Sequence, residues 1–144
     1  MALKTALEQI KDLGGQINDV LRVSTYEEYA DLRGLHVDCK DSEQLFLLKE
    51  LRSILWKLAD AAGSIEYLSR PVKETGFLHR NADGEYQTGK GYLYRSGSLI
   101  EFLAQEDTSG VPCWTVGKVE HDGEDYYLMG YEDIPLDGLH VRVR

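Results

Sequence analysis

Apolar and polar residues follow two different periods along the chain, and the change falls near Pro71. Before this proline, apolar residues recur every three or four positions, as on one face of an α-helix. After it they alternate with polar residues at a period close to two, and ten of the fourteen glycines lie here. The sequence therefore predicts an α+β protein: a helical region in residues 1–70, packed on a small antiparallel β-barrel of the SH3-like type in residues 71–144.

Two segments of the first half carry heptad-like apolar stripes. One stripe comprises Leu3, Leu7, Ile10, Gly14, Ile17 and Leu21, and the other comprises Leu48, Leu51, Leu55, Leu58, Ala62 and Ile65. We expect an antiparallel helical hairpin whose stripes pack against each other and against the second half. A dimeric coiled coil is the alternative, but a seam of about three heptads is marginal for the association of two chains.

The second of these helices has sequence signals at both ends. Asp41 is placed to cap the free amides of the first turn, and Gln44 occupies the position of a capping-box partner. The residue before a proline avoids α-helical backbone angles, so the helix should stop before Pro71. These signals predict a helix from about Ser42 to Leu68.

A short helix is expected between the two long ones. Thr25 and Glu28 form a second capping-box pair, and Gly34 is placed to end that helix. Within the first long helix, Gly14 and Gly15 should weaken or kink the helix, because each glycine costs about 1 kcal/mol relative to alanine.

Turn residues divide the second half into short strands. Asp-Gly pairs follow TGFLHR and WTVGKVEH, a Ser-Gly pair separates GYLYR from SLIEFLA, and EDIPLDG precedes the final LHVRVR. Asp-Gly between apolar runs is a strong hairpin signal, because a type I′ turn needs positive φ at both central residues. We expect about five or six antiparallel strands that close into the barrel.

The stretch GEYQTGKG, residues 84–91, is close to the phosphate-binding loop pattern, with Gly91 in place of the usual Ser or Thr. Such a loop needs a helix immediately after it, so that backbone amides and the helix dipole face the phosphate. Here the strand pattern Tyr92-Leu93-Tyr94-Arg95 follows Lys90. We therefore interpret the stretch as a turn between strands that binds no nucleotide.

Charge and composition narrow the class of partner. The net charge is −9, of which residues 71–144 contribute −6, with seven Lys and Arg against thirteen Asp and Glu. This balance disfavours direct binding of nucleic acid and favours a basic protein partner. No apolar run approaches the roughly 18–20 residues that span a bilayer. The N-terminus also lacks a signal-peptide pattern, so we expect a cytoplasmic protein without a membrane partner.

Candidate chemistry is sparse. Cys39 and Cys113 are too few and too far apart for a disulfide framework or a zinc site, so we expect two free, part-buried thiols, no metal and no cofactor. His79 and His121 could serve a small nuclease or hydrolase, but no G-x-S-x-G or H-E-x-x-H motif accompanies them. The acids around His121 are interpreted as a solvated turn, and a non-enzyme is expected.

The hairpin on either side of Asp122-Gly123 carries most of the aromatic residues that could bind a partner. A two-residue turn would pair His121 with Glu124 and would leave both faces of the hairpin apolar. One face should line the barrel, and the other should either lie under the helices or bind a partner. The predicted partner-binding residues are Trp114, Tyr127 and Tyr131 with Glu120, Asp122, Glu124 and Asp125.

Three functional hypotheses follow. The leading one is a non-catalytic, acidic protein-binding module, with aromatic anchors and with acids that steer a basic partner. The second is a single-stranded nucleic-acid-binding barrel, in which aromatic rings stack on bases. Its phosphate-binding residues would be Lys90, Arg95, Arg142 and Arg144. The third is the nuclease that would use His79 or His121.

The run EYLSRPVKETGFLHRNADGEY, together with VEHDGEDYYLMGY and LDGLHVRVR, resembles an uncharacterised domain family of Firmicutes. The resemblance covers roughly residues 45–144 and rests on turns and aromatic residues. It implies no active-site residue. It implies instead the context of mobile genetic elements, where small acidic proteins of the anti-CRISPR type inhibit basic nucleic-acid-handling proteins.

Overall fold

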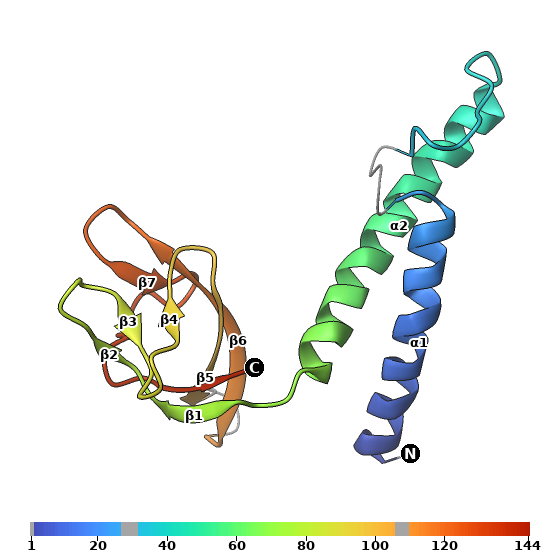
Figure 1. The fold of residues 1–144 in the computed structure, drawn as a ribbon. Helices are drawn as coiled ribbons and strands as arrows, with labels where there is room; N and C mark the ends of the chain where they lie inside the picture. The colour runs from blue at the N-terminus through green and yellow to red at the C-terminus, as the bar shows by residue number, and fades with distance from the viewer. Residues whose placement is uncertain (1, 27–31, 106–109) are drawn as a thin grey trace. The chain divides into compact units, whose positions relative to one another are not determined.

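The protein is described by a computed structural model that covers residues 2–26, 32–105 and 110–144. The chain divides into two compact units, Met1–Arg70 and Pro71–Arg144. The first, the helical unit, contains both helices, and the second, the strand unit, contains all the strands of the described residues (Figure 1). The fold class is therefore α+β, with the helices N-terminal and the strands C-terminal.

The helical unit is an antiparallel hairpin of α1 (Leu3–Val23) and α2 (Ser42–Ser69) (Figure 1). Its buried core consists of Ile17, Leu21, Leu32 and Leu55, and partly buried members of the α2 stripe pack around it. The intramolecular hairpin expected from the two stripes is therefore formed. Within the described residues, neither helix has an apolar stretch long enough to cross a bilayer.

The glycines expected to weaken or kink the first helix do not break it, because α1 runs through Gly14 and Gly15 without interruption; the weakening stays a prediction. Gly14 is buried at the contact with α2, where a Cβ atom would lie 3.0 Å from Cγ2 of Ile65. A Cβ added to Gly15 would meet nothing within 4 Å. The first glycine therefore lets the two helices approach closely, and this packing offsets the low helix propensity.

The predicted start of α2 is confirmed. Oδ1 of Asp41 accepts hydrogen bonds from the backbone N–H of Glu43 and Gln44, at 2.9 and 3.2 Å. The side-chain amide of Gln44 donates to Asp41 at 3.1 Å and accepts from the N–H of Asp38 at 2.9 Å. These interactions satisfy amides that have no partner inside the helix. At the other end, Arg70 is extended before Pro71, as expected for a residue that precedes proline.

The short helix expected between α1 and α2 falls partly on residues 27–31, which lie outside the described residues. Thr25, its proposed cap, lies in the turn after α1 with a φ of 63°. Glu28 is not described, so that capping pair stays a prediction.

The strand unit contains eight strands in its described residues. They are β1 (Glu74–Phe77), β2 (His79–Arg80), β3 (Tyr86–Gln87), β4 (Leu93–Tyr94), β5 (Leu99–Gln105), β6 (Pro112–His121), β7 (Tyr126–Leu128) and β8 (His140–Val143). Five form one sheet in the order β1-β8-β5-β6-β7, and β2-β3-β4 form a second sheet. All the pairs are antiparallel.

No closed barrel is formed by the described strands, because β1 and β7 end the five-stranded sheet and do not pair with each other. The turn at Ser96-Gly97 is part of the reason. It was expected to join two paired strands, but β4 pairs back on β3, while β5 enters the other sheet. The amide of Gly97 donates to the carbonyl of Val119 at 2.8 Å, so the turn itself already lies against β6.

The core of the strand unit includes residues of both sheets. Tyr86 and Tyr94 come from the small sheet, Ile100, Phe102, Val119, Leu128 and Val141 come from the large one, and Leu78 lies between β1 and β2. Gly117 of β6 lies over the ring of Phe102, where a Cβ atom would be only 2.9 Å from Cε1. The absence of a side chain at residue 117 therefore makes room for the largest fully buried side chain of the core.

The stretch GEYQTGKG contains β3, and its last four residues, 88–91, form a turn between β3 and β4, so a turn between strands is present as predicted. Tyr86 pairs with Tyr94 on either side of it, and no helix follows Lys90. The amide of Lys90 donates to the carboxylate of Glu74 at 3.1 Å, and Nζ of Lys90 donates to the carbonyl of Lys73 at 3.3 Å. The lysine therefore anchors this turn to the start of β1.

Candidate interaction surface

The five-stranded sheet has an inner face that lines the core and an outer face that does not. Ile100 and Phe102 of β5 are buried in the core, so their neighbours Leu99, Glu101 and Leu103 lie on the outer face. Pairing across the sheet adds the other outer residues, which are Thr75, Phe77, Trp114, Val116, Lys118, Glu120, Tyr127, His140 and Arg142.

Four outer residues form a contiguous group, here called the Trp114 cluster: Phe77, Trp114, His140 and Arg142. The rings of Phe77 and His140 stack with their centroids 4.7 Å apart. The indole of Trp114 meets the same imidazole edge-on at 5.2 Å, and the guanidinium of Arg142 lies 4.6 Å from the indole centroid. Aromatic rings and arginine in contact form the composition that dominates protein interfaces.

Glu101 holds the arginines of this face in place. Its carboxylate accepts hydrogen bonds from Nε of Arg142 and from Nε of Arg144, and the residue is only 2% exposed. Burial alone raises the pKa of the Glu101 carboxyl, but the two arginines outweigh it, and the net pKa lies below its usual value. The charged triad therefore positions the guanidinium of Arg142 over Trp114 at neutral pH.

The surroundings of the cluster are apolar and open within the strand unit. Phe77 is 62% exposed, Leu99 is 55% exposed and Val116 is 50% exposed. Large apolar side chains on one sheet face, next to a fixed tryptophan and arginine, form a candidate contact surface.

The turn between β6 and β7 differs from the two-residue turn predicted. His121 pairs with Tyr126, and Val119 pairs with Leu128, so residues 122–125 form a four-residue loop. The register is shifted by two positions, and because strands have a period of two, the predicted division of residues between faces survives. Asp122 accepts hydrogen bonds from the amides of the next residues in the loop, Asp125 and Glu124, which lower the pKa of its carboxyl.

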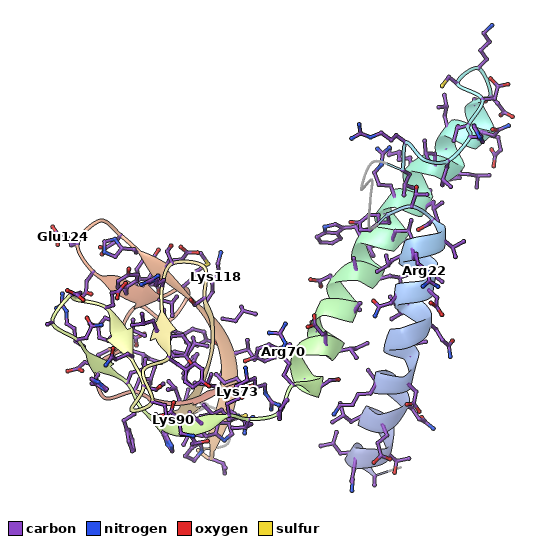
Figure 2. The ribbon with its side chains drawn as sticks, in the orientation of Figure 1. Arg22, Arg70, Lys73, Lys90, Lys118 and Glu124 are labelled. Atoms are coloured by element: carbon purple, nitrogen blue, oxygen red, sulfur yellow. The ribbon has the colours of Figure 1, made fainter. Side chains whose placement is uncertain are left out.

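The predicted acidic residues do not converge on one point. Glu120 forms an ion pair with Lys118 at 2.7 Å and accepts a hydrogen bond from Ser96. Asp125 accepts a hydrogen bond from the hydroxyl of Tyr86 at 3.2 Å. Burial raises the pKa of that hydroxyl, and the charge of Asp125 raises it further. Glu124 is exposed at the tip of the loop (Figure 2).

The predicted aromatic anchors lie in three places. Tyr127 is paired with Glu120 on the outer face. Trp114 is on the same face of β6 but six residues from Glu120, which corresponds to roughly 20 Å along a strand. Tyr131 is outside any strand, and its ring meets Phe102 edge-on at 5.3 Å. The structure thus unites Tyr127 with Glu120, places Trp114 at the far end of their face, and puts Tyr131 against the core.

Sequence reasoning missed Phe77 and His140 as partners of Trp114. They meet because β1 and β8, the first and last strands of the unit, are paired in register. The alternation of residues along a strand indicates only which side chains of that strand share a face. It carried no information about which strands are neighbours.

The residues proposed for nucleic-acid binding or for catalysis each interact with another residue of the strand unit. His79 is 3.2 Å from the side-chain amide of Gln87, and His121 accepts a hydrogen bond from the amide of Gly123 at 3.0 Å. Of the proposed phosphate-binding cations, Arg95 is paired with Glu85 at 2.8 Å, while Arg142 and Arg144 bind Glu101 and Lys90 binds the carbonyl of Lys73. No group of His, Cys, Asp and Glu that could hold a metal ion occurs in the described residues.

The two cysteines are free, and both are exposed, not part-buried as expected. Cys39 lies in the connection from α1 to α2, and Cys113 lies near the start of β6.

Residues 76–143 match a protein-family profile described as Domain of unknown function (DUF5348). The match covers just under half of the chain, from within β1 to the last residue of β8. It assigns no activity to this stretch. No curated protein and no solved structure matches the chain.

Proposed function

We propose that the protein is a non-catalytic protein-binding module. The strand unit would bind a basic protein partner, with the Trp114 cluster as the anchor and the acids of the β6–β7 loop as the steering charges. The observation that carries this proposal is the fixed contact of Trp114 with Arg142 and His140 on an open sheet face, beside a Phe77 that is 62% exposed.

The geometry of the cluster favours binding over a purely structural role. Trp and Arg are the residues most enriched among binding hot spots, and they act best when their side chains need little reordering. Glu101 holds Arg142, and stacking against Phe77 holds His140. The anchor is therefore organised before a partner arrives.

The charge of the unit supports a basic partner. Residues 71–144 carry a net −6, and the loop of residues 122–125 carries three carboxylates at the end of the β6–β7 hairpin. A standard interface buries about 800 Å² on each partner, which is wide enough to include both Trp114 and a loop that begins roughly 27 Å away. Such charges raise the association rate and the selectivity more than the final affinity.

The class of partner that fits these features is a basic nucleic-acid-handling protein. A small acidic protein can occupy the basic channel of such a partner and thereby inhibit it. This is the action of anti-CRISPR-type inhibitors and of similar accessory proteins of mobile elements, the context that the sequence resemblance implied.

The test compares three forms of the full chain as baits in the native host, with captured proteins identified by mass spectrometry. The double variant Phe77→Ala, Trp114→Ala should lose a partner that the wild type captures. The control Trp56→Ala, which removes an exposed tryptophan of α2, should retain it. A captured set that is identical for all three forms would contradict the proposal.

Purified partner then tests the electrostatic part. Replacing Glu120, Asp122, Glu124 and Asp125 by Lys should slow association and remove its acceleration at low salt. Titration of tryptophan fluorescence with single-stranded RNA and DNA at low salt tests the rival function. Binding at micromolar protein that Trp114→Ala abolishes would replace the proposal by nucleic-acid binding. RNA cleavage that is lost in His79→Ala or His121→Ala would refute the non-catalytic role.

A further inference from the structure

The two helices carry apolar rows that the hairpin does not bury. On α1 the row consists of Ala6, Leu13 and Val20, and on α2 it consists of Leu47, Ile54, Ala61 and Leu68. Members of each row are spaced by seven residues, so each row stays on one side of its helix. The stripes that join α1 to α2 lie next to these rows but do not include them.

Both rows lie on the same side of the hairpin. On each helix a row residue directly precedes a stripe residue in the sequence: Val20 precedes Leu21 on α1, and Ile54 precedes Leu55 on α2. In an antiparallel pair of helices, residues at this position lie on the same side of the pair. The opposite flank follows the stripe residues and contains Lys4, Lys11 and Arg52. The hairpin therefore has one apolar side and one charged side, here called the row side and the lysine side.

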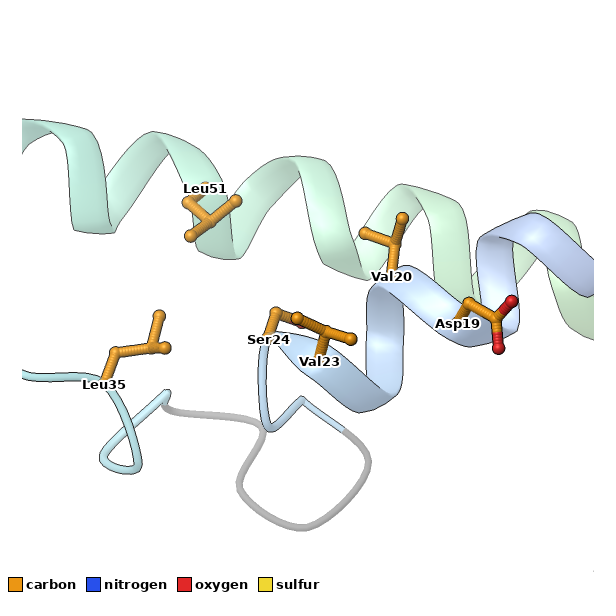
Figure 3. A pocket seen from close by; sticks show the side chains of 6 residues that line it. All are labelled: Asp19, Val20, Val23, Ser24, Leu35 and Leu51. Atoms are coloured by element: carbon orange, nitrogen blue, oxygen red, sulfur yellow. The ribbon is translucent and has the colours of Figure 1, made fainter.

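The row side is open in the helical unit. Ile54 is 52% exposed, Leu47 is 54% exposed and Leu13 is 42% exposed. The same side contains a hollow of about 450 Å³. The hollow is lined by Asp19, Val20, Val23, Ser24, Leu35 and Leu51 (Figure 3). Rows of half-exposed aliphatic side chains beside an apolar hollow are typical of a helix-packing surface.

We propose that the row side binds the row side of a second copy of this chain, so that two hairpins form a four-helix bundle. The available area is sufficient. Five large residues of this side, Leu13, Val20, Leu47, Ile54 and Leu68, are each about half exposed. With unfolded surface of about 1.45 Å² per dalton, these residues expose roughly 750 Å² over two copies. Because interfaces are about 60% apolar, the total is roughly 1,300 Å², within the range of stable complexes.

The charges at the edge of the row side select a second copy over a basic partner. On α1 the edge carries Gln9 and Gln16, and on α2 it carries Glu43, Glu50 and Lys57. This edge has charges of both signs and a net charge of only −1, so it offers a strongly charged partner little gain. A copy related by a twofold axis near Ile54 would bring Glu50 of each chain opposite Lys57 of the other, which is the self-complementarity that an isologous interface needs.

The experiment measures the oligomeric state of the full chain by sedimentation equilibrium over a wide range of concentrations. Cys39→Ser and Cys113→Ser are included in every form, because both thiols are exposed and could cross-link. The proposal expects a concentration-dependent dimer. Ile54→Lys should raise its dissociation constant at least about a hundredfold, because two ammonium groups replace two buried apolar side chains. Trp56→Lys, on the far side of α2, should leave it unchanged.

A second pair of variants keeps the test decisive if one substitution also weakens the hairpin. Ile54→Lys and Ile54→Glu should each be monomeric with unchanged helix content by circular dichroism, and an equimolar mixture should form a heterodimer. A wild-type chain that stays monomeric would overturn the proposal, including the case in which its own strand unit covers the row side. A dimer that Ile54→Lys leaves intact, or a mixture that stays monomeric, would overturn it as well.

Discussion

Replacing Glu101 by Gln tests whether the buried triad organises the strand unit. The substitution preserves the shape of the side chain but removes its charge. One carboxylate oxygen, which accepts a hydrogen bond from an arginine, is replaced by an NH₂ group that cannot accept one. Breaking a buried ion pair costs about 3–5 kcal/mol, and each charge-assisted hydrogen bond contributes about 1.5–3 kcal/mol. The side chains of Arg142 and Arg144 are 25% and 14% exposed, so water can replace part of the lost interaction. We expect a destabilisation of about 2–3 kcal/mol.

Tryptophan fluorescence can follow this unit alone. The chain has two tryptophans, and Trp56→Phe leaves Trp114, which lies against one arm of the triad, as the reporter. For a unit of this size the expected loss corresponds to a decrease of roughly 10–20 °C in the unfolding midpoint. Glu120→Gln is the matched control, because its carboxylate lies at the surface, and the midpoint should stay nearly unchanged.

The pH dependence gives an independent check of the same triad. Because the pKa of folded Glu101 is below its usual value, its stabilisation is fully present above the unfolded pKa of about 4.3. It is lost as the pH falls through the folded pKa. The difference between wild type and Glu101→Gln should therefore be constant near neutrality and shrink below about pH 4. A midpoint unchanged by Glu101→Gln at neutral pH would refute this account of the triad.

Three glycine substitutions test the packing of each unit by urea unfolding. Gly15→Ala should stabilise the hairpin by up to about 1 kcal/mol, because the position is helical and open. Gly14→Leu should destabilise the hairpin by about 1–3 kcal/mol, because Ile65 occupies the space that the new side chain needs. Equal changes in the free energy of unfolding for Gly15→Ala and Gly14→Leu would contradict the close approach of the two helices at Gly14. Gly117→Ala should cost the strand unit about 1–3 kcal/mol through its contact with Phe102, and a neutral result would show that the ring can move away.

The local features of the fold were the predictable ones. The α2 cap at Asp41, the end of the helix before Pro71 and the turn in GEYQTGKG each depend on residues a few positions apart. Such interactions form in the same way wherever the segment lies in the molecule. The role of Gly14 was not predictable in this way, because it depends on a close contact with Ile65, a residue far away in the chain.

The candidate surface was predictable only in part. The alternation of β6 and β7 assigned Trp114 and Tyr127 to one face, and this assignment survived a loop two residues longer than expected. The neighbours of Trp114 could not be found in this way, since Phe77 and His140 come from strands at opposite ends of the unit. The four acids were grouped because they are close in sequence, but side chains of one loop point to different partners.

The sequence by itself determined the two regions of different period, the helix ends and the positions of the main turns. Each of these depends on backbone preferences and hydrogen bonds within a few residues. Only the tertiary structure decided that the strands form two sheets, that Glu101 binds two arginines and that the two helices bury one stripe each while other apolar rows stay exposed within the helical unit. The physical reason is that periodicity specifies which side chains share a face, while the partner of that face depends on contacts between segments far apart in the chain.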